Sequence, residues 1–86
     1  MTPKQKKAHL ANLMIMIKGS GFTEDSYGNW TRKHKGYSYR IKVKKINIRV
    51  EKKSVNSKIW FKIFSEPIVN VSFTKMASFI KRFSTN

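Results

Sequence analysis

Lysine, arginine and a tryptophan set among them are the residues of this chain that could do chemistry. Nineteen lysines and arginines stand against four aspartates and glutamates in 86 residues, for a formal net charge of +15. Because such an excess repels itself in a folded domain, a polyanionic partner would offset it. The charge therefore indicates a nucleic acid or another anionic partner, whereas the alternative is that lysine only keeps the surface soluble.

The cations recur on alternate residues between positions 37 and 64. The stretch YSYRIKVKKINIRVEKK (37–53) alternates apolar and basic residues, and KIWFKIF (58–64) does so again. Alternate residues of a strand point to the same face, so paired strands would gather these cations and a tryptophan on one face. The candidate nucleic-acid-binding residues are Arg40, Lys42, Arg49, Lys58, Trp60 and Lys62.

Such a face would have the chemistry of nucleic-acid binding. Like charges directly opposite in a sheet repel, as Arg40 and Arg49 would in one possible register, and phosphates between them would turn the repulsion into binding. About five or six phosphate contacts predict a slope of log affinity against log salt of about −4 to −5. A base could stack on Trp60, while both arginines could stack on bases or fork onto phosphates. A solvated sheet face, with Trp60 wedged under a loop, is the structural alternative.

Catalytic and metal-binding patterns are weak. There is no cysteine, and the two histidines, His9 and His34, cannot form a three-histidine metal cluster. No glycine-rich phosphate loop and no Ser-His-acid order is present. His34 could act as a general base in RNA cleavage, although an ordinary polar strand residue is the simpler interpretation. We therefore expect a non-enzymatic protein with no cofactor and no metal site.

The first element that the spacing predicts is a helix over residues 3–18. Thr2 and Pro3 are typical of a helix start, and apolar residues then recur at helical spacing. We expect Gly19, with Gly21 close behind it, to end the helix in the left-handed way. A basic cluster opens this helix and consists of Lys4, Lys6 and Lys7 with His9. The cluster could add a phosphate contact or could be a solvated helix end.

Alternation predicts the strands. A first strand covers 30–34, and residues 37–53 form a hairpin that reverses near Lys44 and Lys45, through a two-residue loop or a four-residue loop 44–47. Because no Asn-Gly or Asp-Gly turn is present, one continuous strand with a bulge is the alternative. Both registers place the same apolar side chains on one face: Tyr37, Tyr39, Ile41, Val43, Ile46, Ile48 and Val50. A last strand covers 58–64. It adds Ile59, Phe61 and Ile63 to the apolar face and Lys58, Trp60 and Lys62 to the basic face.

A closing helix completes the fold. Ser72 or Thr74 can cap it, and its apolar stripe consists of Phe73, Met76, Ile80 and Phe83. We expect residues 1–86 to form a single α+β domain, with an antiparallel sheet of three to four strands and both helices packed on one face (α-β-β-β-β-α). The longest apolar run, 13–17, is too short to cross a bilayer, and no signal peptide is evident. We therefore expect a cytoplasmic protein without a membrane partner.

The element order resembles that of the double-stranded RNA-binding fold and of the HicA-type mRNA-interferase toxins. The likeness to the toxins is carried by LANLMIMIKGSGF (10–22), a helix running into Gly-Phe, and by TKMASFIKRF (74–83), a closing helix. It implies a ribonuclease with a catalytic histidine. Those toxins have Gly-Ser just before that histidine, whereas Lys33 precedes His34 here and Gly36 follows it, so catalysis is not carried over.

Three blocks resemble small accessory proteins of AT-rich bacteriophages: GFTEDSYGNW (21–30), YSYRIKVKKINIRVEKK (37–53) and KIWFKI (58–63). Such proteins commonly act against the host, including as inhibitors of CRISPR and other defences. The resemblance implies a host-takeover or anti-defence factor in the host cytoplasm, bound to a host ribonucleoprotein or to an acidic surface of a host protein. From the residues we expect a small basic module that binds RNA or DNA. The phage-type inhibitor is the alternative, and a HicA-like ribonuclease is the third.

Overall fold

The computed structural model describes residues 1–84 and has the α+β class that the sequence predicts. Its elements are α1 (Pro3–Gly19), β1 (Thr23–Glu24), β2 (Trp30–His34), β3 (Tyr37–Val43), β4 (Asn47–Ser54), β5 (Phe61–Pro67), the 3-10 turn η1 (Ile68–Asn70), α2 (Phe73–Ile80) and the 3-10 turn η2 (Lys81–Phe83). The strands form one antiparallel sheet in the order β1-β2-β3-β4-β5. The expected three to four strands are corrected to five, because the two-residue β1 adds an edge strand beside β2.

The first helix begins as its sequence predicts and ends slightly later. Thr2 and Gln5 form a capping box, in which each side chain accepts a hydrogen bond from the other residue's backbone N–H. Gly19 is the last helical residue, and it is Gly21 that adopts the left-handed conformation, with φ of 88°. The left-handed residue is therefore Gly21, the second of the two glycines, and not Gly19. Ser20 lies between them and donates hydrogen bonds to carbonyl oxygens of α1 through its backbone N–H and its hydroxyl group.

The β3–β4 hairpin has the longer of the two registers left open by the sequence. Val43 pairs with Ile48 and Ile41 with Val50, so the loop is the four-residue one and the two-residue register is wrong. Ile46 is 72% exposed and does not join the apolar face. The reason is that it lies in the loop, where its carbonyl oxygen accepts a hydrogen bond from Ile68 N at 2.7 Å.

The last strand differs most from the prediction. It begins at Phe61, and an irregularity between Val50 and Glu51 leaves one extra residue, Ile63, on β5. An extra residue reverses the alternation, so Phe64 faces the core although it has the same parity as Lys62. Ile59 and Phe61 were expected on the apolar face, but they are 64% and 59% exposed.

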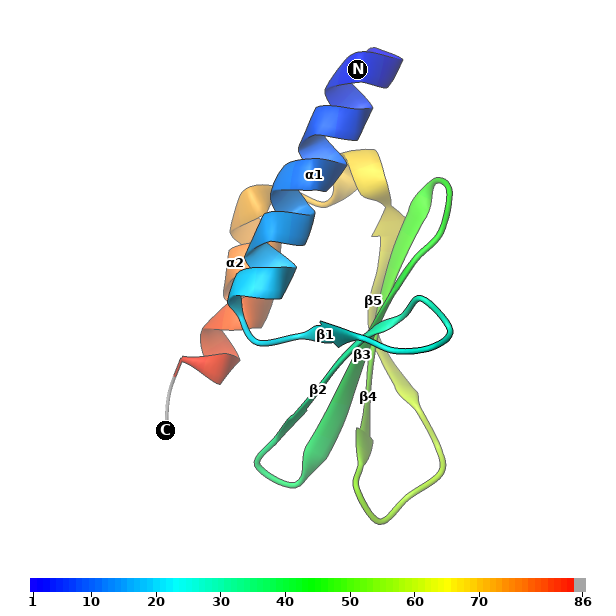
Figure 1. Cartoon of the computed structure of the whole chain (residues 1–86), viewed down its shortest axis with the longest axis vertical. Coiled ribbons are helices and arrows are strands. Elements are labelled where there is room, and N and C mark those ends of the chain that lie inside the picture. The colour runs from blue at the N-terminus through cyan, green and yellow to red at the C-terminus, as the bar shows by residue number, and fades with distance from the viewer. Residues whose placement is uncertain (85–86) are drawn as a thin grey trace.

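Both helices cover the same face of the sheet, as predicted (Figure 1). The buried core joins α1, the sheet and α2 and consists of Leu13, Ile17, Phe22, Tyr39, Ile41, Ile48, Val50, Ile68, Val71, Met76, Phe79 and Phe83. Ser72, not Thr74, caps α2 by accepting a hydrogen bond from Lys75 N. In the predicted stripe Phe73 is exposed, and Phe79 takes its place as the central buried ring of the helix.

Two polar side chains fasten α1 to the rest of the molecule. The guanidinium of Arg32, on the helix side of β2, donates to the carbonyl oxygen of Ser20 and lies over the ring of Phe83, 4.8 Å from its centroid. His9 donates through Nε2 to the carbonyl oxygen of Val71 at 2.7 Å.

Neither helix of residues 1–84 offers an apolar stretch of the length that a bilayer requires.

Replacement of Gly19 and of Gly21 by alanine should change the free energy of unfolding in opposite directions. Gly21→Ala should lower the free energy of unfolding by about 1–2 kcal/mol, because an L-residue resists positive φ. Its new Cβ would also lie 2.8 Å from Arg32 Nη1. Gly19→Ala has open space around it and should raise the free energy of unfolding by up to about 1 kcal/mol, since alanine favours helix. Chemical denaturation of both variants tests this; equal effects would contradict the assignment of the reversal to Gly21.

Candidate nucleic-acid interface

The face of the sheet opposite the helices is the candidate site. The strand register sorts its side chains into three rows that run across β2, β3, β4 and β5. The rows are Lys33–Ser38–Lys53, then Thr31–Arg40–Glu51–Lys62, then Lys42–Arg49–Ser65. We call these residues, together with Trp60, the open face. It carries six cations and one carboxylate, so its formal charge is five units positive.

The structure brings most of the predicted site residues together. Arg40, Lys42, Arg49 and Lys62 lie on the open face, and the Trp60 ring packs over Arg40. Lys58 is exposed in the loop before β5 and lies outside the three rows. Lys33 and Lys53 lie on the open face although the sequence pattern did not predict them there. Their shared row depends on the tight turn at Lys35 and Gly36, whose φ values of 47° and 82° are those of a two-residue hairpin loop.

Glu51 is the centre of the open face. Its carboxylate accepts hydrogen bonds from Arg40 Nε at Oε1 and from Arg49 Nε at Oε2, both at 2.9 Å. Arg40 Nη2 is also 2.9 Å from Oε1, and Lys42 Nζ is 3.9 Å from it. The glutamate side chain is only 5% exposed. The opposition of Arg40 and Arg49 that the two-residue register would have given does not occur, because the longer register places Arg40 opposite Glu51 and Arg49 opposite Lys42.

This environment lowers the pKa of Glu51. Burial by itself acts to raise the pKa of the carboxyl group, because desolvation disfavours the charged form. The hydrogen bonds from Arg49 and Arg40, with the positive charges of Arg40 and Lys42, act in the other direction and prevail. Glu51 is thus held ionised between its cationic neighbours.

Trp60 lies against cations and not in the hydrophobic core. The guanidinium carbon of Arg40 is 4.0 Å from the ring centroid, and Lys53 Nζ is 5.5 Å from it. Lys53 also donates to the carbonyl oxygen of Ser57 at 3.1 Å, which fixes the loop from which Trp60 emerges. Cations over an indole face are stabilising because the ring carries negative charge there. The tryptophan is therefore positioned by the same cations that give the face its charge.

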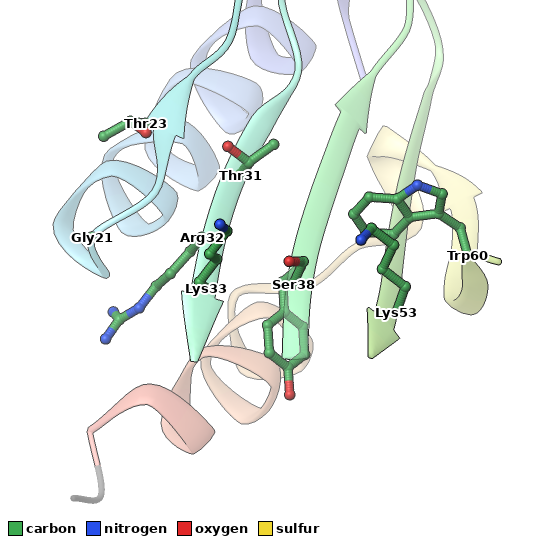
Figure 2. A pocket seen from close by; sticks show the side chains of 9 residues that line it. Gly21, Thr23, Thr31, Arg32, Lys33, Ser38, Lys53 and Trp60 are labelled. Carbon is green, nitrogen blue, oxygen red and sulfur yellow. The ribbon is translucent and has the colours of Figure 1, made fainter. Parts of the chain in front are cut away.

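A groove of about 770 Å³ runs along one end of the open face. Figure 2 shows Thr23 and Thr31 at one end of this groove, Ser38 in the middle, and Lys53 with Trp60 at the other end. Its remaining lining residues are Gly21, Arg32, Lys33 and Tyr39. The groove thus combines hydroxyl groups, ammonium groups and one indole ring.

The histidines do not belong to the open face. His34 is half-buried on the helix side, with its ring 5.3 Å from that of Phe83 and its Nε2 buried without a hydrogen-bond partner. His9 is used in fastening α1, as described above, so it does not extend the basic cluster at the start of that helix. Among residues 1–84 no group of three or more His, Cys, Asp or Glu is placed to hold a metal ion.

Comparison with known proteins found no relative of this chain. No protein-family model, no curated protein and no solved structure matches the chain.

Replacing the central carboxylate tests its structural role. Glu51→Gln should lower the free energy of unfolding by about 1–3 kcal/mol at neutral pH, because two arginines lose a charged acceptor in a buried site. Glu66→Gln is the matched control. Its ion pair with Lys75, at 2.6 Å, is one-third exposed at both partners, and its loss should cost less than about 1 kcal/mol. Equal losses from the two variants, measured by chemical denaturation, would contradict the central role of Glu51.

The contribution of Glu51 should also depend on pH. Because its pKa is lower in the folded state, its stabilisation is complete above the unfolded pKa of about 4.3 and is lost as the pH falls through the folded pKa. The difference in unfolding free energy between the unmodified protein and Glu51→Gln should therefore be constant near neutral pH and shrink in acid. A difference that grows in acid would overturn the assignment.

Proposed function

We propose that this protein binds nucleic acid through the open face, as a small non-catalytic module. The observation that carries the proposal is the excess of six cations over one carboxylate on a face that no helix covers. Phosphate groups are the ligands that such a surface neutralises best, because each contact releases a condensed counterion from the nucleic acid.

The cations of the open face divide into two groups by their partners. Arg40 is 21% exposed and gives two of its N–H groups to Glu51 while its plane rests on Trp60, so we assign it to holding the site together. Arg49 is 43% exposed and donates to Glu51 through Nε alone. Its terminal amino groups remain available for a forked contact with phosphate.

Lys33 and Lys62 are the cations most available for ligand. Both are exposed, and within residues 1–84 neither side chain makes a hydrogen bond or an ion pair. They lie in neighbouring rows of the same face, Lys33 on β2 toward one edge of the sheet and Lys62 on β5 at the other. A nucleic-acid backbone that contacts both lysines would therefore pass close to Glu51 and its cationic neighbours, where Arg49 can add a further phosphate contact.

The salt dependence of binding tests this surface. The double variant Lys33→Gln/Lys62→Gln should reduce the slope of log affinity against log salt by about 1.5–2 units, since each phosphate contact contributes about 0.7–0.9. Lys4→Gln/Lys81→Gln removes the same charge from exposed lysines in α1 and η2 and should change the slope by much less. The measurement is fluorescence anisotropy of a labelled oligonucleotide over a series of salt concentrations.

Two results would reject the proposal. Equal slopes for the two double variants would show that net charge, not the open face, governs binding. Absence of nucleic-acid binding, together with capture of one host protein that survives nuclease treatment, would favour the phage-type inhibitor.

A further inference from the structure

We infer that the groove beside Trp60 seats an unpaired nucleotide, so that the preferred ligand is single-stranded nucleic acid. This inference rests on the proposed function and goes beyond it, because charge alone does not distinguish a single strand from a duplex. It depends on three features of the groove, namely its aromatic wall, its hydroxyl groups and the position of its lysines.

The aromatic wall of the groove is the ring of Trp60, which takes no part in the hydrophobic core. It is also absent from the side chains packed against that core. Its ring instead stands at one end of the groove, fixed by Arg40 on the ring face and by Lys53, which is itself tied to the loop at Ser57. A ring held in place before binding loses little conformational freedom when a base stacks on it.

Only an unpaired base can use such a wall. In a duplex the faces of the bases are covered by their neighbours, and a protein reaches phosphates, sugars and base edges. In a single strand each base has a free face, and stacking on an aromatic side chain is the usual contact. The end of the groove at Trp60 therefore has no ligand group to meet in an intact duplex.

The middle of the groove suits the polar parts of a nucleotide. Ser38 lies between Lys33 on β2 and Lys53 on β4 in one cross-strand row, and Thr31 and Thr23 continue the hydroxyl lining toward β1. Hydroxyl groups both donate and accept hydrogen bonds, so they can meet any base edge or a sugar oxygen. Adjacent strands are about 4.8 Å apart, so Lys33 on β2 and Lys53 on β4, which contacts Trp60, are about 10 Å apart across the sheet, which is room for a base on Trp60 with its phosphate near Lys33.

Affinities for single and double strands test the inference. The probes are an oligothymidylate, an oligouridylate of the same length, and a DNA duplex with the same number of phosphates. The unmodified protein should bind at least one single strand roughly tenfold more tightly than the duplex, and the two single strands distinguish DNA from RNA as the source of the nucleotide. Trp60→Ala should weaken single-strand binding by roughly tenfold or more and weaken duplex binding much less, so that the preference for a single strand falls.

Two further variants keep the test decisive if Trp60→Ala loosens the fold. Trp60→Phe keeps a stacking ring and should retain most of the single-strand preference. Ser38→Leu places an apolar side chain in the middle of the groove and should reduce single-strand affinity more than duplex affinity, with circular dichroism as the check on folding. In a Trp30→Phe background, the emission of Trp60 should be quenched by oligothymidylate or oligouridylate and not by heparin.

The outcomes separate this inference from the proposed function. If duplex and single strands bind equally, and Trp60→Phe, Ser38→Leu and the unmodified protein behave alike, the groove does not seat a base, although the open face still binds phosphate. If none of the three nucleic acids binds, both the inference and the proposed function fail.

Discussion

The contact of the Glu51 carboxylate with its three cationic neighbours is the interaction on which the open face depends. Like charges on adjacent strands repel one another, so Arg40, Lys42 and Arg49 gather more easily with an anion between them. The carboxylate offsets part of this repulsion and orients both guanidinium groups. It neutralises one charge, and the remaining excess is the basis of the proposed binding of phosphate.

The extra residue in β5 is the second constraint, because it lets one strand supply side chains both to the hydrophobic core and to the open face. Lys62 and Phe64 are two residues apart, and in a regular strand they would lie on the same face. Here Ile63 is an extra residue between them, so Lys62 lies beside Glu51 on the open face and Phe64 points to the core. The centroid of the Phe64 ring is 6.3 Å from that of Phe79. Without the bulge, either the core would lose an aromatic ring or the open face would lose a cation.

Position relative to the sheet decides what each basic residue does. Arg32 and Arg40 lie on neighbouring strands, yet the first points to the helix layer and fastens the end of α1, whereas the second supports Trp60 on the open face. Lys33 follows Arg32 directly and is exposed on the opposite side. A count of cations in the sequence therefore overstates the proposed binding surface, since only six of the nineteen lie on the open face.

Periodicity within single segments was enough to predict the helices and the separation of apolar from basic side chains in residues 37–53. It could not choose the hairpin register, since a shift of two residues keeps every side chain on the same face. Three features became visible only in the folded chain: Glu51 lies opposite Arg40, β5 contains an extra residue, and Lys33 and Lys53 flank the groove. These features depend on pairing between strands, and the packing of the helices against Phe64 and its neighbours selects one pairing from several that satisfy the same local pattern.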